Sequence, residues 1–237
     1  MPANRIKIDN AVLKRYKYKA AKRPKRPIRC NILIVCEGTK TEPNYFKSFS
    51  SYNRGTFVYD ITIKGIGENT INVVDKAIEL RNKAQKTEQE YDRVWAVFDK
   101  DSFSDANFNS AIIKARDNNI CCAWSNEAFE LWYLFHFSYQ ETGLSREKYK
   151  KAISDFVNHS KAYKAKKPYV YEKNSDQNYH IVNKYGSQER AIKLAEAKSK
   201  EYPDEKYANH NPCTMVYKLV LQLIGKDPTL NSELSQK

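Results

Sequence analysis

The sequence has little of what would mark a secreted, zinc-binding or membrane-spanning protein. Its five cysteines are odd in number, and they form no Cys-x-x-Cys pair or Cys/His cluster, so neither a disulfide framework nor a zinc site is expected. No stretch approaches the ~18–20 apolar residues that a membrane-spanning helix needs. The basic N-terminus is not followed by the apolar region of a secretion signal. We therefore expect a cytoplasmic protein with no membrane contact.

Acidic residues are scarce relative to basic ones. Against 28 Asp and Glu the chain has 41 Lys and Arg, which gives a formal net charge of +13. An excess of this size favours a polyanionic partner, and with a membrane set aside that partner is nucleic acid. Residues 1–29 hold eleven of the basic residues, three prolines and a single acid, Asp9. They are predicted to form a flexible basic arm that contacts phosphates, although a solubilising tail would have the same composition.

Short apolar runs alternate with helical patterns through the first half of the chain. The runs at 31–36 and 94–99 are mostly apolar, as expected of strands buried on both faces. Strands are predicted at 31–36, 57–64, 94–99 and 120–124, and helices at 41–50, 70–83 and 106–118. Alternation of this kind predicts an α/β fold, with a parallel sheet flanked by helices and right-handed crossovers.

The pattern changes near residue 137. We assign residues 30–137 to an α/β core that ends in a strongly apolar helix at 126–137, and residues 138–237 to a helical extension. Further helices are predicted at 145–157, 187–201 and 212–224. Residues 158–185 are polar, basic and rich in tyrosine, which predicts a long surface loop, and residues 225–237 are predicted to be a frayed tail.

Three acids follow predicted strands at what should be one edge of the sheet. Glu37 comes after the first strand, and Asp99 and Asp101 come after the third. Ligands of open parallel sheets bind beyond the carboxyl ends of the strands, so these carboxylates are expected to converge. Carboxylates without Cys or His favour Mg²⁺ or Mn²⁺. The alternative is that the acids only cap the helices that follow.

Such a site suits the hydrolysis of phosphodiesters. A metal held by Asp99 and Asp101 would neutralise phosphoryl charge and acidify a bound water. Glu37 is the candidate for a further metal ligand or a general acid/base, and Lys40 for a phosphate contact. Glu130 lies in the apolar helix, where it either joins the metal site or forms a structural salt bridge.

A second candidate region is the segment from Lys161 to residue 174, which interleaves five lysines with three tyrosines. Cations follow a phosphate backbone and aromatic rings stack on bases, as binding of single-stranded nucleic acid requires. The alternative is an ordinary exposed loop. The residues predicted to contact nucleic acid are Lys161, Lys164, Lys166, Lys167 and Tyr169.

Four blocks of the sequence resemble those of RloB-like proteins, a branch of the Toprim superfamily with OLD-type nucleases as relatives. The blocks are ILIVCEGTKTEPNYF (32–46), VFDKD (97–101), FELW (129–132) and NPCTMVYKLV (211–220). The resemblance implies a Toprim-like core with Glu37, Asp99 and Asp101 as the active-site acids, and it matches Glu42 and Glu130 to further acids of the family. One departure is Glu127, which stands where the family pattern has proline; this leaves open whether Glu127 joins the site or only starts a helix.

The resemblance also implies a function and a partner. RloB-like proteins resemble the nuclease half of bacterial defence modules whose other half is an ABC-type ATPase. A Mg²⁺-dependent nuclease that acts as an anti-phage effector is therefore expected. The alternatives are a non-catalytic nucleic-acid-binding or regulatory subunit, and an adaptor that docks the ATPase. Whether the substrate is RNA or DNA, and whether the chain is a homo-oligomer, stays open.

Overall fold

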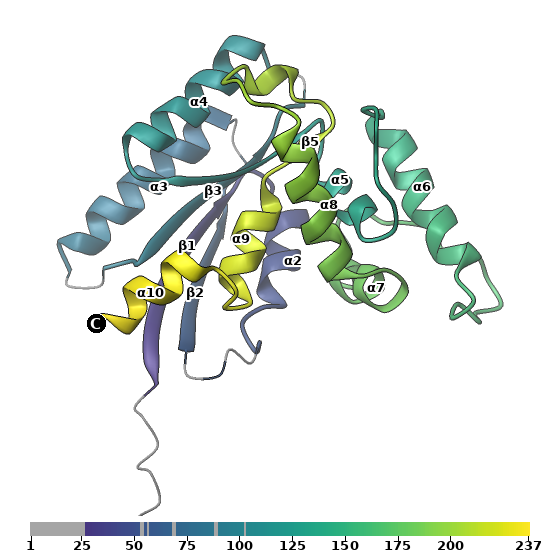
Figure 1. Cartoon of the computed structure of the whole chain (residues 1–237), viewed down its shortest axis with the longest axis horizontal. Helices are drawn as coiled ribbons and strands as arrows, with labels where there is room; N and C mark the ends of the chain where they lie inside the picture. The colour runs from purple at the N-terminus through teal and green to yellow at the C-terminus, as the bar shows by residue number, and fades with distance from the viewer. Residues whose placement is uncertain (1–26, 53–54, 56, 68–69, 88–89, 102) are drawn as a thin grey trace, which may run out of the picture.

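A computed structural model describes residues 27–52, 55, 57–67, 70–87, 90–101 and 103–237 (Figure 1). Most of the predicted basic arm, residues 1–26, lies outside the described residues. Its last two residues do not belong to an arm, because β1 (Ile28–Cys36) begins there and Arg29 forms an ion pair of 3.0 Å with Asp60 on the neighbouring strand. Among the described residues, no helix is both long enough and apolar enough to cross a membrane.

The predicted α/β fold is confirmed. Strands and helices alternate as β1, α2 (Thr41–Lys47), β2 (Phe57–Gly65), α3 (Thr70–Gln85), β3 (Arg93–Asp99), α4 (Asp105–Asp117) and β4 (Cys121–Asn126). The strands lie in one sheet in the order β2-β1-β3-β4-β5, and the pairs among β1, β2, β3 and β4 are parallel. The carboxyl ends of β1 and β3, the central neighbours, therefore point to the same edge of the sheet.

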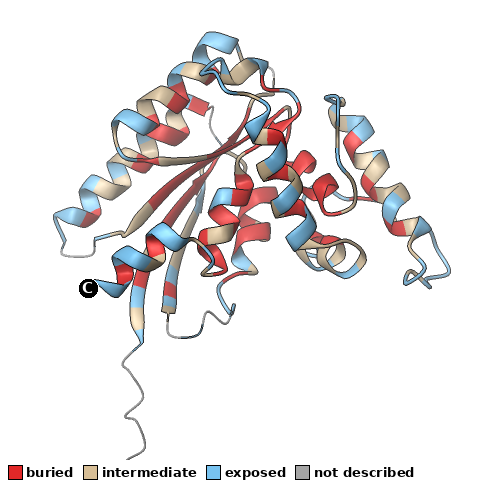
Figure 2. Cartoon of the chain, in the orientation of Figure 1, coloured by how far each residue is buried: buried red, intermediate tan, exposed pale blue. Residues whose placement is uncertain are grey.

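Side chains of β1 alternate between two hydrophobic clusters, one on each face of the sheet. Leu33 and Val35 belong to the cluster covered by α3 and α4, whereas Ile32 and Ile34 belong to the larger cluster on the other face. Both sets are fully buried, as the apolar run at 31–36 predicts for a central strand (Figure 2). Helices from the second half of the chain cover this larger cluster.

The second half is helical, as predicted, but several boundaries differ. It contains α5 (Glu130–Phe135), α6 (Arg146–His159), α7 (Asn178–Tyr185), α8 (Gln188–Lys200), the 3₁₀ turn η1 (Tyr207–Asn209), β5 (Cys213–Thr214), α9 (Val216–Leu223) and α10 (Pro228–Ser235). The loop predicted at 158–185 is wrong at its end, because α7 forms there and buries Val182. The division of the chain at residue 137 stays a prediction.

Two helix predictions are wrong because a short strand was missed. β5 pairs antiparallel with β4 through Ser125 with Thr214 and Asn126 with Cys213, and the Ser125 and Thr214 hydroxyls lie 2.8 Å apart. β4 therefore extends to Asn126, and α5 begins at Glu130 rather than at residue 126. For the same reason α9 begins at Val216 rather than at residue 212. A two-residue strand carries no periodicity that a sequence pattern could reveal.

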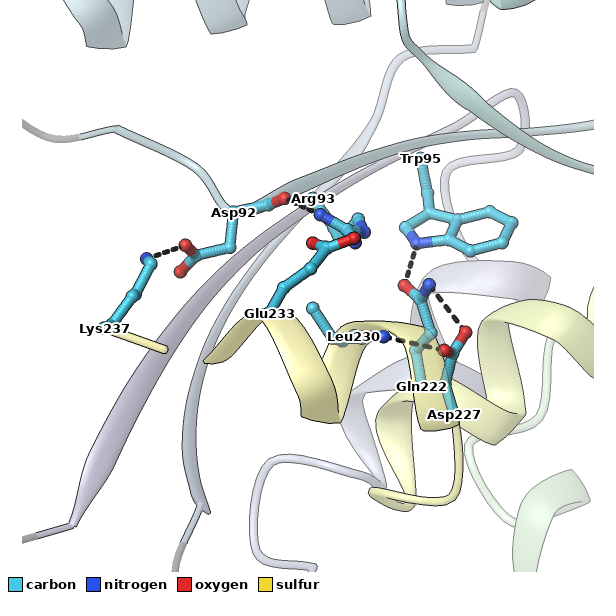
Figure 3. Close-up of polar contacts among 8 residues, drawn as sticks. All are labelled: Asp92, Arg93, Trp95, Gln222, Asp227, Leu230, Glu233 and Lys237. Atoms are coloured by element: carbon cyan, nitrogen blue, oxygen red, sulfur yellow. Dashed lines mark hydrogen bonds and ion pairs between the residues drawn. The ribbon is translucent and has the colours of Figure 1, made fainter. Parts of the chain in front are cut away.

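The predicted frayed tail is also wrong, because residues 228–235 form α10 against the start of β3 (Figure 3). Asp227 caps the helix by accepting a hydrogen bond of 2.9 Å from the Leu230 N–H. Glu233 forms an ion pair with Arg93, and Lys237 forms one with Asp92. Beside the helix, the Trp95 indole N–H donates a buried hydrogen bond of 2.9 Å to the side chain of Gln222 on α9. Burial of Leu230 and Leu234 supplies the apolar contribution.

Candidate functional site

Glu37 stands at the carboxyl end of β1 and is held by its backbone. Its N–H donates to the Val97 carbonyl at 2.8 Å, and its carbonyl accepts from the Gly67 N–H at 2.8 Å. These bonds connect Glu37 to β3 on one side and to the turn after β2 on the other. The backbone of the residue is therefore fixed by three neighbouring strands.

Asp99 and Asp101 lie at the end of β3, next to Glu37. The Asp99 N–H donates a hydrogen bond of 3.0 Å to Glu37 Oε2, which joins the two strand ends directly. Asp101 has a φ of 39°, a left-handed conformation that aspartate tolerates better than most residues. The Asp101 N–H donates to the Glu127 carbonyl at 3.1 Å. Glu127 thus contributes its backbone to the turn and lies three residues before the start of α5.

Glu42, on α2, brings a fourth carboxylate to the same place. Its side chain is buried, and its Oε2 atom has no hydrogen-bond partner among the described residues. A Cβ atom on Gly38 would lie 2.2 Å from this oxygen. Because real Cβ contacts are never so short, position 38 has to be glycine for the carboxylate of Glu42 to stay where it is.

Two cations face these acids from the second half of the chain. Arg146, the first residue of α6, places its Nη2 atom 3.1 Å from Asp101 and 3.6 Å from Asp99. Lys173 lines the same cavity. It belongs to the segment of lysines and tyrosines at residues 161–174, which we call the tyrosine-rich segment. Its carbonyl accepts a hydrogen bond of 3.1 Å from the Thr41 hydroxyl at the start of α2. The segment is therefore tied to the helix that carries Glu42.

These side chains line one cavity of about 330 Å³ at the carboxyl edge of the sheet. The predicted convergence of Glu37, Asp99 and Asp101 agrees with this arrangement, and their chemical roles stay predictions. The lining residues are Glu37, Gly38, Glu42, Gly67, Asp99, Asp101, Phe103, Arg146 and Lys173. We call this space the acidic cavity.

Burial and mutual repulsion make three carboxylates of the acidic cavity, those of Glu37, Asp99 and Glu42, hard to ionise. The pKa of Glu37 is raised to about 7, chiefly by burial and also by the charges of Glu42 and Asp101, while the hydrogen bond from Asp99 and the charge of Arg146 oppose the rise. Burial, and then the charges of Glu42, Glu130 and Glu37, raise the pKa of Asp99 well above its usual range. Burial likewise raises the pKa of Glu42. Such a cluster favours any cation that enters it.

Glu130 lies behind the cavity rather than in its wall. Its side chain is fully buried at the first position of α5, and its Oε1 atom accepts a hydrogen bond of 3.2 Å from the Tyr171 hydroxyl. Its Oε2 atom has no hydrogen-bond partner in the described part of the chain. The predicted structural salt bridge of Glu130 does not occur among the described residues. The other predicted role of Glu130, in metal binding, stays a prediction.

The donor set fits Mg²⁺ or Mn²⁺ in chemistry, although the carboxylates are not gathered into a ligand shell. Among the described residues, no three His, Cys, Asp or Glu side chains are arranged closely enough to hold a metal ion. Arg146 lies between Asp99 and Asp101, where it supplies the positive charge. The unpartnered oxygen of Glu42 and the four carboxylates of the lining, which contains no Cys or His among the described residues, are the observations that favour a hard divalent cation.

The other predicted contacts lie outside the acidic cavity. Lys40 is exposed just before α2 and is not part of the lining. Lys161, Lys164 and Lys166 are exposed, and Lys167 and Tyr169 line a different cavity. Sequence reasoning did not single out Arg146 or Lys173. Lys173 could have been found as the fifth lysine of the segment that was predicted to bind nucleic acid. Arg146 could not, because no signal in the sequence predicts that the start of α6 lies beside the strand ends.

The fold and the site together define an α/β protein with an acidic cavity at the carboxyl edge of a parallel sheet. The family model described as RloB-like protein matches residues 32–223 of the 237-residue chain, so the chain belongs to this family. The match contains every residue that lines the acidic cavity. No curated protein and no solved structure matches the chain.

Proposed function

We propose that this RloB-like protein is a metal-dependent nuclease that hydrolyses phosphodiester bonds of RNA or DNA in the acidic cavity. The observation that carries the proposal is the meeting of carboxylates from β1, β3 and α2 with the cations Arg146 and Lys173 in one cavity. Phosphodiester hydrolysis needs both kinds of charge, because a metal must be held while the phosphate is neutralised.

The acids divide into two roles. Asp99, Asp101 and Glu37 would hold Mg²⁺ or Mn²⁺, with Glu42 in the same lining and the buried Glu130 behind it adding negative charge. The bound metal would supply a water of lowered pKa and charge neutralisation at the phosphoryl oxygens. Glu37, whose pKa burial raises to about 7, suits proton transfer near neutral pH.

The cations position the substrate. Arg146 offers a planar fork that can bind two phosphate oxygens at once, and Lys173 offers a single point charge. Both line the same cavity as the acids at the strand ends, Arg146 from α6 and Lys173 from the tyrosine-rich segment. A phosphate bound there would displace Arg146 from Asp99 and Asp101 and free these carboxylates for a metal.

A biological setting is proposed together with the activity. We propose that the chain is the effector of a bacterial anti-phage defence or restriction-associated system and works with an ABC-type ATPase partner. Membership of the RloB-like family and the strongly basic chain support this assignment. An ATPase that restrains the nuclease until infection would leave the isolated chain with low activity.

Cleavage by the purified full chain tests the proposal. Labelled single-stranded RNA, tRNA and single- and double-stranded DNA are incubated with Mg²⁺, Mn²⁺ or EDTA. We expect cleavage that needs metal and falls more than about a hundredfold in Asp99→Asn, because the variant loses a charged ligand. Asp117→Asn, which changes an exposed acid on α4, is the matched control.

The alternative is a non-catalytic nucleic-acid-binding or regulatory subunit, which the net charge of +13 also favours. This role predicts salt-dependent binding that is the same in wild type and Asp99→Asn. Binding without cleavage, both alone and after reconstitution with the ATPase, would favour the subunit over the nuclease.

A further inference from the structure

A second cavity, of about 500 Å³, is lined mainly by the tyrosine-rich segment, which also contributes Lys173 to the acidic cavity. We call it the tyrosine pocket. Its lining is largely apolar and aromatic, and it includes Tyr163, Pro168, Tyr169, Val170 and Ile181. Its volume falls within the range of ordinary small-molecule sites.

The two cavities share a wall. Glu172 lines the tyrosine pocket, and the next residue, Lys173, lines the acidic cavity. Since consecutive Cα atoms are about 3.8 Å apart, one stretch of backbone contributes to the lining of both cavities. Close by in the same segment, the Tyr171 hydroxyl donates a hydrogen bond to the buried Glu130.

The tyrosine pocket is preformed. Asn158, on α6, makes two hydrogen bonds to the backbone of Tyr169, one to its N–H at 2.7 Å and one to its carbonyl at 2.9 Å. The Tyr171 N–H donates to the Ser154 hydroxyl at 2.9 Å, and the Tyr163 hydroxyl donates to the Lys167 carbonyl at 2.8 Å. The bonds from Asn158 and Ser154 go to backbone groups, so they hold the loop in shape without depending on the ring of Tyr169.

The segment that forms the pocket carries lysines without an acidic partner among the described residues, and Lys167 is part of the lining. The side chains of Lys161, Lys164, Lys166 and Lys167 are exposed, and none of them forms an ion pair in the part of the chain that the structure describes. Val170, at the rim, is 70% exposed. Most lysines on the neighbouring helices α6 and α8 that face solvent have an acidic partner one turn away, such as Lys151 with Asp155 and Lys193 with Glu189.

We propose that the tyrosine pocket binds an unpaired base of a single-stranded nucleic acid, while the lysines around it bind the flanking phosphates and the strand continues over Lys173 into the acidic cavity. An apolar, aromatic pocket on a segment that carries exposed lysines matches a ligand that is flat and apolar in one part and anionic in the next. In a duplex the bases are stacked and paired, so they cannot enter. This inference rests on the proposed function, and it names the substrate as single-stranded.

Binding to labelled oligonucleotides tests the inference without any need for catalysis. The full chain in EDTA is titrated into single strands of about 12 nucleotides, within the site sizes of single-strand-binding folds, and into an abasic strand and a duplex of the same length. We expect the base-bearing strand to bind at least about fivefold more tightly than the abasic strand and the duplex.

Two variants perturb the pocket in opposite ways. Tyr169→Leu removes a ring but keeps the backbone clamp of Asn158, and Ala165→Phe fills the pocket. Each should abolish the preference for the base-bearing strand and leave abasic binding unchanged. Tyr139→Leu, at an exposed tyrosine outside the pocket, is the matched control. Circular dichroism verifies that each variant is folded.

The lysines are tested through salt dependence. Replacing Lys164 and Lys166 by Gln should lower the slope of log affinity against log salt by about 1.4, whereas the same change at Lys83 and Lys86, at the end of α3, should not.

Equal affinity for base-bearing and abasic strands, or equal affinity for the duplex, would overturn the inference. So would an unchanged preference in folded Tyr169→Leu and Ala165→Phe proteins. Base-dependent binding without metal-dependent cleavage would instead keep the inference and reject the nuclease, so the two failures can be told apart.

Discussion

At the scale of single residues, Arg146 decides the charge balance of the acidic cavity. Its Nη2 atom contacts Asp101 at 3.1 Å and Asp99 at 3.6 Å, and its charge opposes the rise in the pKa of both Glu37 and Asp99. Without another cation, this guanidinium limits the repulsion among the carboxylates. A divalent metal and Arg146 should therefore compete for the same two aspartates.

Arg146→Gln is expected to destabilise the metal-free protein by about 1–3 kcal/mol, because it leaves a mostly buried acid without its partner. Mg²⁺ or Mn²⁺ should then raise the melting temperature of the variant by more than it raises that of wild type, because ligand binding stabilises the folded state. Thermal unfolding in EDTA and in Mg²⁺ measures both effects.

Arg116→Gln, which removes an exposed pair with Glu205, is the control. Equal metal shifts in Arg146→Gln and wild type would contradict the competition.

At the scale of elements, α10 shows how a short C-terminal helix can belong to the fold. It contacts β1, and its polar groups pair with Asp92 and Arg93 at the start of β3 (Figure 3). Surface ion pairs of this kind contribute little, so the burial of Leu230 and Leu234 must supply most of the stabilisation.

Leu230→Ala and Leu234→Ala are each expected to lower the free energy of unfolding by about 2–4 kcal/mol, as large-to-small changes in a core do. Ser232→Ala, at an exposed position of the same helix, should change it by less than about 0.5 kcal/mol. Urea denaturation followed by circular dichroism gives the three values. A frayed tail would instead make all three variants indistinguishable from wild type.

At the scale of the whole molecule, the acidic cavity and the buried His136 give the stability opposite dependences on pH. Burial lowers the pKa of His136 to about 4, against hydrogen bonds to backbone groups that raise it. Its Nδ1 atom lies 3.0 Å from the Trp132 carbonyl, and its Nε2 atom has no partner among the described residues. In contrast, the pKa of Glu37 is raised, so the folded state binds this proton more tightly than the unfolded chain does. Protonation of Glu37 therefore adds to the stability of the folded state as the pH falls through about 7.

The stability that the neutral His136 contributes should be complete above pH ~6.5 and lost as the pH falls toward 4, because the unfolded chain takes up a proton first. The difference corresponds to about 3 kcal/mol. His136→Gln should therefore lose less stability than wild type between pH 7 and 4.5, which chemical denaturation at each pH measures. His159→Gln, at an exposed histidine, should follow wild type. Parallel curves for His136→Gln and wild type would refute this assignment.

The sequence by itself determined the layers of the fold and the acids at the strand ends. The apolar runs at 31–36 and 94–99 specify central strands because only a strand buried on both faces needs apolar residues at successive positions. Once those strands are parallel, Glu37, Asp99 and Asp101 must meet at one edge, so their convergence follows from local pattern and topology.

Only the tertiary structure decided what faces those acids. Arg146 and Lys173 come from segments more than a hundred residues after Glu37, and their approach depends on how α6 and the tyrosine-rich segment pack on α2 and α5. β5 and α10 were missed because two residues have no periodicity and because a short amphipathic helix is stable only against its partner surface. The tyrosine pocket likewise exists only where Asn158 and Ser154 hold the loop. Local sequence pattern records backbone preference and burial, whereas contacts between distant segments are set by packing.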